Sequence, residues 1–159
     1  MRAEVFPGRY TVAETDQEVT VFLIGMRVNK WWKLPVWLPV AKAMPPMLKH
    51  LQAEPVAGLL GFESWFGRTT ILLTYWTSPA HLRDFASDAR APHLAPWRRY
   101  MKEVGSSGDV GVWHETFKVA AADREAVYAN MPRFGLANAL GHAKIGPGRN
   151  TARQRMRSQ

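Results

Sequence analysis

The sequence predicts an α+β fold in which strands and helical segments follow one another in the order β-α-β-β-α-β. Runs rich in β-branched and aromatic residues, a composition typical of strands, occur four times along the chain. Segments with prolines at possible helix starts separate the first run from the second and the third from the fourth. This order is that of the ferredoxin-like fold, an antiparallel sheet with both helices on one face.

The first predicted strand is Glu18 to Met26, and both of its faces are largely apolar. Prolines at 35, 39, 45 and 46 exclude one straight helix in the segment that follows. Two short helices, Val36–Met44 and Pro46–Ala53, fit that segment better, and Pro46 suits a first helical position.

A hairpin and a second helical segment complete the pattern. Gly58 to Phe66 and Thr69 to Trp76 are predicted to pair across a tight turn. Ser78-Pro79 predicts an N-cap and a helix start, and Ala91-Pro92 predicts a restart. The fourth predicted strand is Val110 to Val119, and the apolar stripe before it consists of Leu94, Trp97, Met101 and Val104.

The two ends of the chain are expected to add little to this unit. Residues 1–17 resemble an extended or loose leader with a turn at Pro7-Gly8. We therefore divide the chain into one ferredoxin-like α/β-barrel domain, residues 1–130, and a Gly-rich, basic C-terminal tail, residues 131–159. A further short helix is predicted from Asp123 to Ala129.

The sheet face without helices also carries large apolar residues from all four predicted strands. A second copy of the sheet is the simplest cover for it. The sequence therefore predicts a homodimer that closes into a dimeric α/β barrel with an internal cavity. Seven tryptophans and seven phenylalanines supply bulky, rigid side chains to line this cavity, which would bind a small-molecule substrate.

Composition excludes several classes of protein. The absence of cysteine excludes disulfides, zinc-thiolate sites, iron–sulfur clusters and a cysteine nucleophile. No apolar run reaches the ~18–20 residues of a membrane span, and the N-terminus lacks the apolar stretch of a signal peptide. These observations predict a cytoplasmic protein with no membrane partner.

The net charge of +8 is concentrated near the C-terminus. Six basic and no acidic residues follow residue 130, which leaves 8 − 6 = +2 for the rest of the chain. The charge therefore indicates a solvated basic terminus, and no nucleic-acid-binding motif accompanies it. The sequence also lacks the glycine-rich nucleotide loops, the His-Glu-x-x-His zinc motif and the Gly-x-Ser-x-Gly elbow.

His114 is the most informative histidine because it lies in the middle of an apolar strand. Strand alternation places it with Val112 and Thr116 on one face, and Trp113 with Glu115 on the other. Imidazole serves as an acid or base near neutral pH. The alternative is a core histidine bonded to a backbone carbonyl.

His93 lies in the first turn of the second helical segment, beside its apolar stripe. Neutral imidazole is a common haem-iron ligand. Trp97 occupies the i+4 position, so no second His, Asp or Glu completes a chelating metal pair there. His50 and His81 fall on outer helix faces, and His142 lies in the tail.

Four segments resemble a bacterial and fungal family of monooxygenase-like proteins, a domain of unknown function in the dimeric α/β-barrel superfamily. They are VFLIGMRVN at 21–29, SDARAPHLAPWRRY at 87–100, SGDVGVWHETFKV at 107–119 and EAVYANMPRFGL at 125–136. The resemblance covers almost the whole chain before the basic tail. It implies the same fold as the strand and helix pattern.

The chain is more distantly similar to the C-terminal half of haem-containing aldoxime dehydratases. There, a histidine near a helix ligates the haem iron, and a His-Glu pair on the next strand supplies the distal acid/base. His93 and His114-Glu115 are 114 − 93 = 21 residues apart, which is similar to that arrangement. The resemblance implies that His93 is the axial ligand, with Trp97 beside the cofactor, and that His114 is the distal catalytic group. The resemblances thus imply three catalytic candidates, which are His114, Glu115 beside it, and Arg27 as a charged pocket residue.

Three functions remain open at this point. The first is a haem-binding enzyme that acts on a small organic substrate by dehydration or oxygen chemistry. The second is a cofactor-independent monooxygenase with His114 as its base. The third is a non-catalytic barrel that binds a small molecule.

Overall fold

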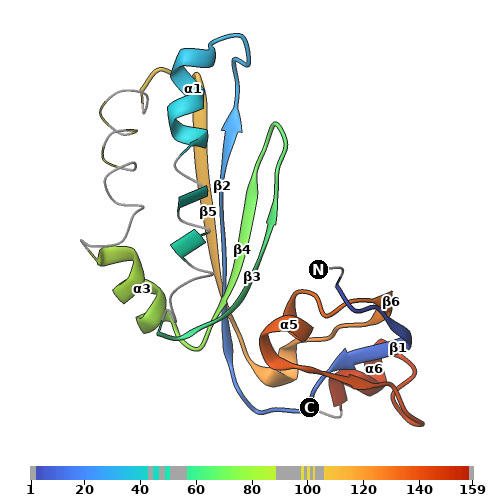
Figure 1. The fold of residues 1–159 in the computed structure, drawn as a ribbon. Helices are drawn as coiled ribbons and strands as arrows, with labels where there is room; N and C mark the ends of the chain where they lie inside the picture. Colours follow the sequence, from blue (N-terminus) through green and yellow to red (C-terminus); the bar gives the residue numbers. More distant parts are fainter. Residues whose placement is uncertain are drawn as a thin grey trace.

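The structure is a computed structural model. It describes residues 3–42, 45–46, 49–50, 57–88, 98, 100, 102 and 106–157. A long four-stranded sheet with helices along one side forms the larger part (Figure 1). A smaller three-stranded sheet lies at the end of the molecule away from α1 (Figure 1).

The large sheet has the predicted ferredoxin-like topology. Its strands are β2 (Val19–Val28), β3 (Leu59–Trp65), β4 (Ile71–Trp76) and β5 (Val110–Val119). They pair antiparallel in the order β3-β4-β2-β5. This order confirms the α+β, βαββαβ fold class predicted from the sequence. β5 has the predicted bounds, and the other strands differ from prediction by one or two residues at their ends.

The described helices follow the proline and capping signals. α1 (Leu34–Ala41) begins two residues before its predicted start, because Pro35 is tolerated in the first helical turn. α3 (Pro79–Ser87) begins as predicted, and Ser78 Oγ accepts a hydrogen bond of 3.2 Å from the backbone N–H of His81. Residues 46, 49 and 50 are helical, as the second predicted helix requires, and residue 45 just before its predicted start is helical too.

The second helical segment lies largely outside the described residues. Residues 98, 100 and 102 are helical. Tyr100 is buried, and its hydroxyl donates a 3.0 Å hydrogen bond to the carbonyl oxygen of Val110 at the start of β5. The helical layer thus packs on the sheet face that carries Met26 and Val110, with Val36 and Trp37 of α1 against the same cluster.

Gly25 marks a close approach between β2 and the strand beside it. A Cβ at this position would lie 1.9 Å from the carbonyl oxygen of Thr70 and 2.9 Å from Trp113 Nε1. Because the first of these atoms belongs to the backbone, the neighbouring chain has to move. We expect Gly25→Ala to lower the free energy of unfolding by about 3 kcal/mol in a urea titration.

Gly67, in the turn between β3 and β4, is the matched control for this substitution. Its nearest neighbour would be the carbonyl oxygen of Thr69, at 3.7 Å. Gly67→Ala should therefore change the free energy of unfolding by less than about 1 kcal/mol. Equal effects of the two substitutions would contradict a packing role for Gly25.

The N-terminal segment, predicted as an extended or loose leader, is extended and forms a strand of the small sheet. β1 (Phe6–Val12) is the central strand of the small sheet, between β6 (Tyr128–Met131) and β7 (His142–Lys144). Pro7 and Gly8 lie where the register shifts between Phe6 and Arg9, and Gly8 has a φ of 97°. A bulge accommodates a proline and a left-handed glycine within a strand, so the Pro-Gly pair does not end it.

The helix predicted from Asp123 to Ala129 is wrong. A single 3-10 turn (η1, Ala121–Asp123) ends there, and the chain then extends into β6. The buried guanidinium of Arg124 donates to the carbonyl oxygens of Gln17 and Thr15 at 2.5 and 2.6 Å. These bonds draw the segment against the N-terminal strand, where pairing with β1 replaces helical hydrogen bonds.

The basic C-terminal segment takes part in the fold. It contains α5 (Leu136–Leu140), β7 and α6 (Ala152–Arg157). Arg155 is buried and donates to Glu125 at 2.5 Å, and Arg149 pairs with Glu14 at 2.7 Å. The expectation of a wholly solvated basic terminus is therefore wrong for these two arginines. The division into one domain and a tail at residue 130 stays a prediction.

Part of the sheet face opposite the helices is covered by α5 of the same chain. The carboxylate of Glu63 on β3 accepts a 3.0 Å hydrogen bond from the backbone N–H of Gly135, just before α5. Trp65 packs edge-on against Phe134, with ring centroids 5.9 Å apart. The sheet is open within one chain, with β3 and β5 as its edges, so a single copy forms no closed barrel. Within the described residues, no helix is long and apolar enough to cross a membrane.

Candidate functional site

His114 lies in the middle of β5, on the side of the sheet that the helices face. It is directly opposite Ile24 in the β2–β5 register, which places its side chain with those of Val112 and Thr116. This confirms the face predicted by strand alternation. The imidazole nevertheless remains exposed. It is therefore accessible to a small molecule and is not a buried core histidine.

The surface around His114 is apolar. Its ring lies 5.9 Å from that of Phe22, and both Phe22 and Ile24 are half-buried. The adjoining residues of β4, Leu72 and Thr74, are buried, and the Thr74 hydroxyl donates to the carbonyl oxygen of Phe22 at 3.1 Å. The hydroxyl of Thr74 thus has a backbone partner. The exposed imidazole of His114 therefore lies beside an apolar surface.

Glu115 and Arg27 do not join His114. Glu115 is opposite Leu23 and Arg27 is opposite Gly111, so both side chains lie on the other face of the sheet. Both are exposed, and the Arg27 guanidinium donates to the Thr69 hydroxyl at 2.9 Å. The three residues predicted as catalytic therefore occupy two faces.

The predicted cofactor-binding residues His93 and Trp97 lie outside the described residues, as does most of the apolar stripe that accompanies them. Among the residues that the structure does describe, no three His, Asp or Glu side chains gather as a metal cage would require.

The other described histidines have structural neighbours of their own. His81 Nδ1 lies 2.7 Å from the Thr77 hydroxyl and 3.0 Å from that of Ser78, at the start of α3. His142 packs in the small sheet, with its ring 4.4 Å from that of Phe6. His50 stacks on Phe85 at 6.4 Å. His114 is thus the described histidine whose position suits chemistry.

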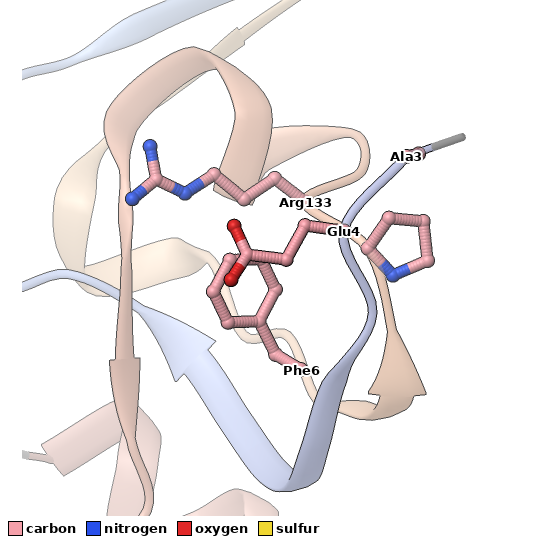
Figure 2. Close-up of a pocket in the computed structure, with 5 residues that line it drawn as sticks. Ala3, Glu4, Phe6 and Arg133 are labelled. Carbon is pink, nitrogen blue, oxygen red and sulfur yellow. The ribbon is translucent and has the colours of Figure 1, made fainter. Parts of the chain in front are cut away.

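A surface pocket of about 340 Å³ lies beside the small sheet, away from His114. It is lined by Ala3, Glu4, Phe6, Pro132 and Arg133. Figure 2 shows the Glu4 carboxylate and the Arg133 side chain on the same side of the Phe6 ring. The guanidinium carbon lies 5.9 Å from that ring centroid, which is a cation–π distance. None of the predicted site residues lines this pocket.

A tyrosine pair that the sequence did not predict, the buried Tyr75 and the half-buried Tyr128, lies under α5. The hydroxyl of Tyr128 accepts a 3.2 Å hydrogen bond from the backbone N–H of Ala137. Burial, with smaller contributions from the nearby Tyr128 and Glu63, raises the pKa of Tyr75 to about 12. Burial also raises the pKa of Tyr128. Residues 75 and 128 are far apart in the sequence, so no local pattern joins them.

This pair predicts a loss of stability at alkaline pH. Because the pKa of Tyr75 is raised from 10.0 to about 12 by folding, its contribution is complete below pH 10 and is lost as pH rises toward 12. Urea midpoints measured across that interval should fall less steeply for Tyr75→Phe than for the wild type. Identical slopes for the two proteins would contradict the assignment.

Comparisons with known proteins agree with this fold. Residues 19–136 match the Monooxygenase af470-like family. A crystal structure of an aldoxime dehydratase in complex with butyraldoxime has a TM-score of 0.63 at 16% identity, over 89% of this chain and 43% of that one. This chain thus spans less than half the length of that enzyme.

Two other solved structures are less similar. A possible oxidoreductase of unknown function from Bacteroides thetaiotaomicron has a TM-score of 0.40 at 12% identity, over 64% of this chain and 98% of that one. A putative antibiotic biosynthesis monooxygenase from Bordetella bronchiseptica has a TM-score of 0.31 at 16% identity, over 62% and 96%. No curated protein matches the sequence. Because the family match extends over well more than half of the sequence, the chain belongs to the Monooxygenase af470-like family.

Proposed function

We propose that this protein is a haem-binding enzyme that acts on a small organic substrate. His93 would ligate the haem iron, and His114 would supply the acid/base at the substrate. The observation that carries the proposal is the position of His114, an exposed imidazole on the helix-facing, apolar side of the sheet. The shared fold with an aldoxime dehydratase and the 21-residue spacing from His93 support it.

The described residues on the His114 side suit a haem. A porphyrin needs an apolar surface, and Phe22 and Ile24 supply one beside the imidazole. A single protein imidazole is sufficient to ligate haem iron, so a bound haem would need no cage of side chains. His93 would be that donor, with Trp97 beside it.

A bound haem supplies a Lewis-acidic, redox-active iron. The task of His114 is to move protons at the substrate. In the dehydration of an aldoxime, the N–O bond breaks, the leaving hydroxyl takes a proton from the imidazolium, and the imidazole then accepts the proton from the aldoxime carbon. The products are a nitrile and water. Neither Glu115 nor Arg27 takes part in this step, since both lie on the other face of the sheet.

A cofactor-free monooxygenase is the second candidate, and membership of a monooxygenase family favours it. In that case His114 takes a proton from a CH₂ group of a conjugated substrate, and the resulting carbanion adds oxygen. The imidazolium returns the proton to give a hydroperoxide, and loss of water leaves a carbonyl group. The third alternative, a non-catalytic barrel that binds a small molecule, predicts neither dehydration nor oxygen consumption.

The experiment is a titration of ferric haem into the purified full chain, followed by assays of nitrile formation from butyraldoxime and of oxygen uptake. The haem enzyme predicts a saturable complex at one haem per chain. If added haem produces no ligand-field spectrum, the proposal is wrong. Oxygen uptake that depends on His114 would then support the cofactor-free enzyme.

We also propose that two copies associate through the sheet face opposite the helices. α5 covers only the β3 side of that face, and Phe117 on β5 remains 50% exposed there. Leu23 and Leu73 on the same face are half-buried. Apolar positions of this kind are typical of an interface.

Phe117→Asp tests this association. Because Phe117 is exposed in one copy, the substitution should leave the monomer folded while it places an unpaired carboxylate in the interface. Such a charge costs about 3–5 kcal/mol, which is a hundredfold or greater loss of affinity. Light scattering should show a dimer for the wild type and for Val127→Asp, which lies elsewhere, and a monomer for Phe117→Asp. A monomeric wild type at micromolar concentration would contradict the proposal.

A further inference from the structure

Large apolar side chains stand in solvent at one end of the large sheet. We call this set the apolar tip, and it consists of Trp31, Trp32, Leu34, Leu38 and Phe66. Trp31, Trp32 and Phe66 are 66%, 60% and 67% exposed. In Figure 1 this is the upper end, where the chain passes from β2 into α1 and where the β3–β4 hairpin turns. None of these residues belongs to the His114 site.

The apolar tip is preformed. The rings of Trp31 and Trp32 meet edge to face at 6.1 Å, and the indole of Trp37 donates to the carbonyl oxygen of Trp31 at 2.9 Å. The hairpin is tied to the same turn, because the Arg68 guanidinium donates to the carbonyl oxygens of Val28 and Asn29 at 3.2 and 3.3 Å. Binding of a partner to these side chains therefore costs little conformational entropy, because they are already ordered.

Helix α1 is apolar throughout but contains no buried residue. Its sequence, LPVWLPVA, has no charged side chain. Val36 and Trp37 contact the core, whereas Leu34 and Leu38 face solvent. A helix that is apolar on all sides is normally buried in a protein core or placed in a membrane. The outer side of α1 is thus available to an apolar partner.

Positive charge surrounds the apolar tip. Lys30, Lys33, Lys42 and Arg68 lie in or beside it. The carboxylate of Asp109 contacts Lys30 Nζ at 2.6 Å and Lys33 Nζ at 2.8 Å, and it is almost fully buried. Hydrogen bonds from the two lysines hold the pKa of Asp109 below its usual range, so the carboxylate stays charged. Among the described residues at this end, these four cations against the one carboxylate leave an excess of positive charge.

We propose that the apolar tip binds the surface of a bilayer that contains anionic lipids. Tryptophan favours the headgroup region because its ring is apolar and its N–H is polar, and lysine and arginine contact the phosphates. A second copy of this chain would bring the same positive charges together, which disfavours that occupant. The sequence predicted no membrane partner from the lack of a span and a leader, but surface binding requires neither.

The test is flotation of the full chain with vesicles, using the double variant Trp31→Ala/Trp32→Ala. One set of vesicles is phosphatidylcholine alone, and the other has about one third phosphatidylserine. The wild type should float with the anionic vesicles and bind them about tenfold more tightly than the neutral ones, with weaker binding at high salt. The double variant should lose about tenfold or more of this affinity.

The matched control is Val127→Ala/Met156→Ala, which removes apolar groups that are exposed elsewhere and should bind as the wild type does. Lys42→Glu, at an exposed position after α1, should weaken binding to the anionic vesicles alone. Circular dichroism checks that each variant is folded. The proposal is overturned if the wild type does not float or if the tryptophan variant floats equally well. A change of oligomeric size in that variant, without flotation of the wild type, would assign the tip to a contact between copies.

Discussion

His114→Ala is expected to retain haem and to lose turnover by about 10²–10⁴-fold, the usual contribution of a positioned acid or base. The reason is that the proposed function assigns proton transfer at the substrate to His114 and ligation of the iron to His93. Its exposed position means that its removal opens no cavity in the core. The measurement is kcat on a haem-loaded sample whose Soret absorbance equals that of the wild type.

Lys118→Ala is the control for this prediction, because Lys118 is exposed on the same strand and face, near the end of β5. It should retain the wild-type rate. Added imidazole should restore part of the activity of His114→Ala but leave the wild type unchanged. If His114→Ala is unfolded, the imidazole is required for the fold and the site assignment is wrong.

His93→Ala is expected to lose haem outright, since the proposal gives the iron a single ligand from the protein. The purified variant should lack the Soret band, and titrated haem should give no saturable complex. Free imidazole should restore a complex by filling the vacated ligand position.

The control is His81→Ala, which removes an exposed imidazole at the start of α3. It should bind haem as the wild type does. Full haem occupancy in His93→Ala would contradict the ligand assignment without affecting the role of His114.

The large sheet was predictable from the sequence because its signals are local. Four runs of β-branched and aromatic residues mark the strands, and Ser78-Pro79 marks the start of α3. The small sheet was not predictable in this way. β1 pairs with residues more than a hundred positions away, and β7 is only three residues long. Local propensity carries no information about such distant pairing.

Some features of the candidate site were likewise predictable from the sequence, and others were not. Strand alternation predicted the face of His114, since a period of two needs no tertiary knowledge. Glu115 and Arg27 were grouped with it by resemblance, but the period of two places Glu115 on the other face and the β2–β5 register does the same for Arg27. The approach of Phe22 to His114 depends on that register, which no pattern in either strand alone specifies.

The apolar tip also required the structure. The sequence contains the pair Trp31-Trp32 and an apolar helix after it, a composition that a buried helix shares. Only the exposure of these side chains, together with the contact of Arg68 with Asn29, distinguishes a surface from a core.

The proposed function places the cofactor on the helix-facing side of the sheet and not on the opposite side. The test is to compare the haem affinities of two variants, Ile24→Trp and Leu23→Trp. Ile24 and Leu23 are neighbours in β2 that project to opposite faces, and both are half-buried. With folding checked by circular dichroism, Ile24→Trp beside His114 should weaken haem binding about tenfold or more, by filling the space against the apolar surface. Leu23→Trp should bind haem within about twofold of the wild type. Loss of haem affinity in Leu23→Trp alone, or unchanged affinity in both variants, would contradict cofactor binding on the helix-facing side.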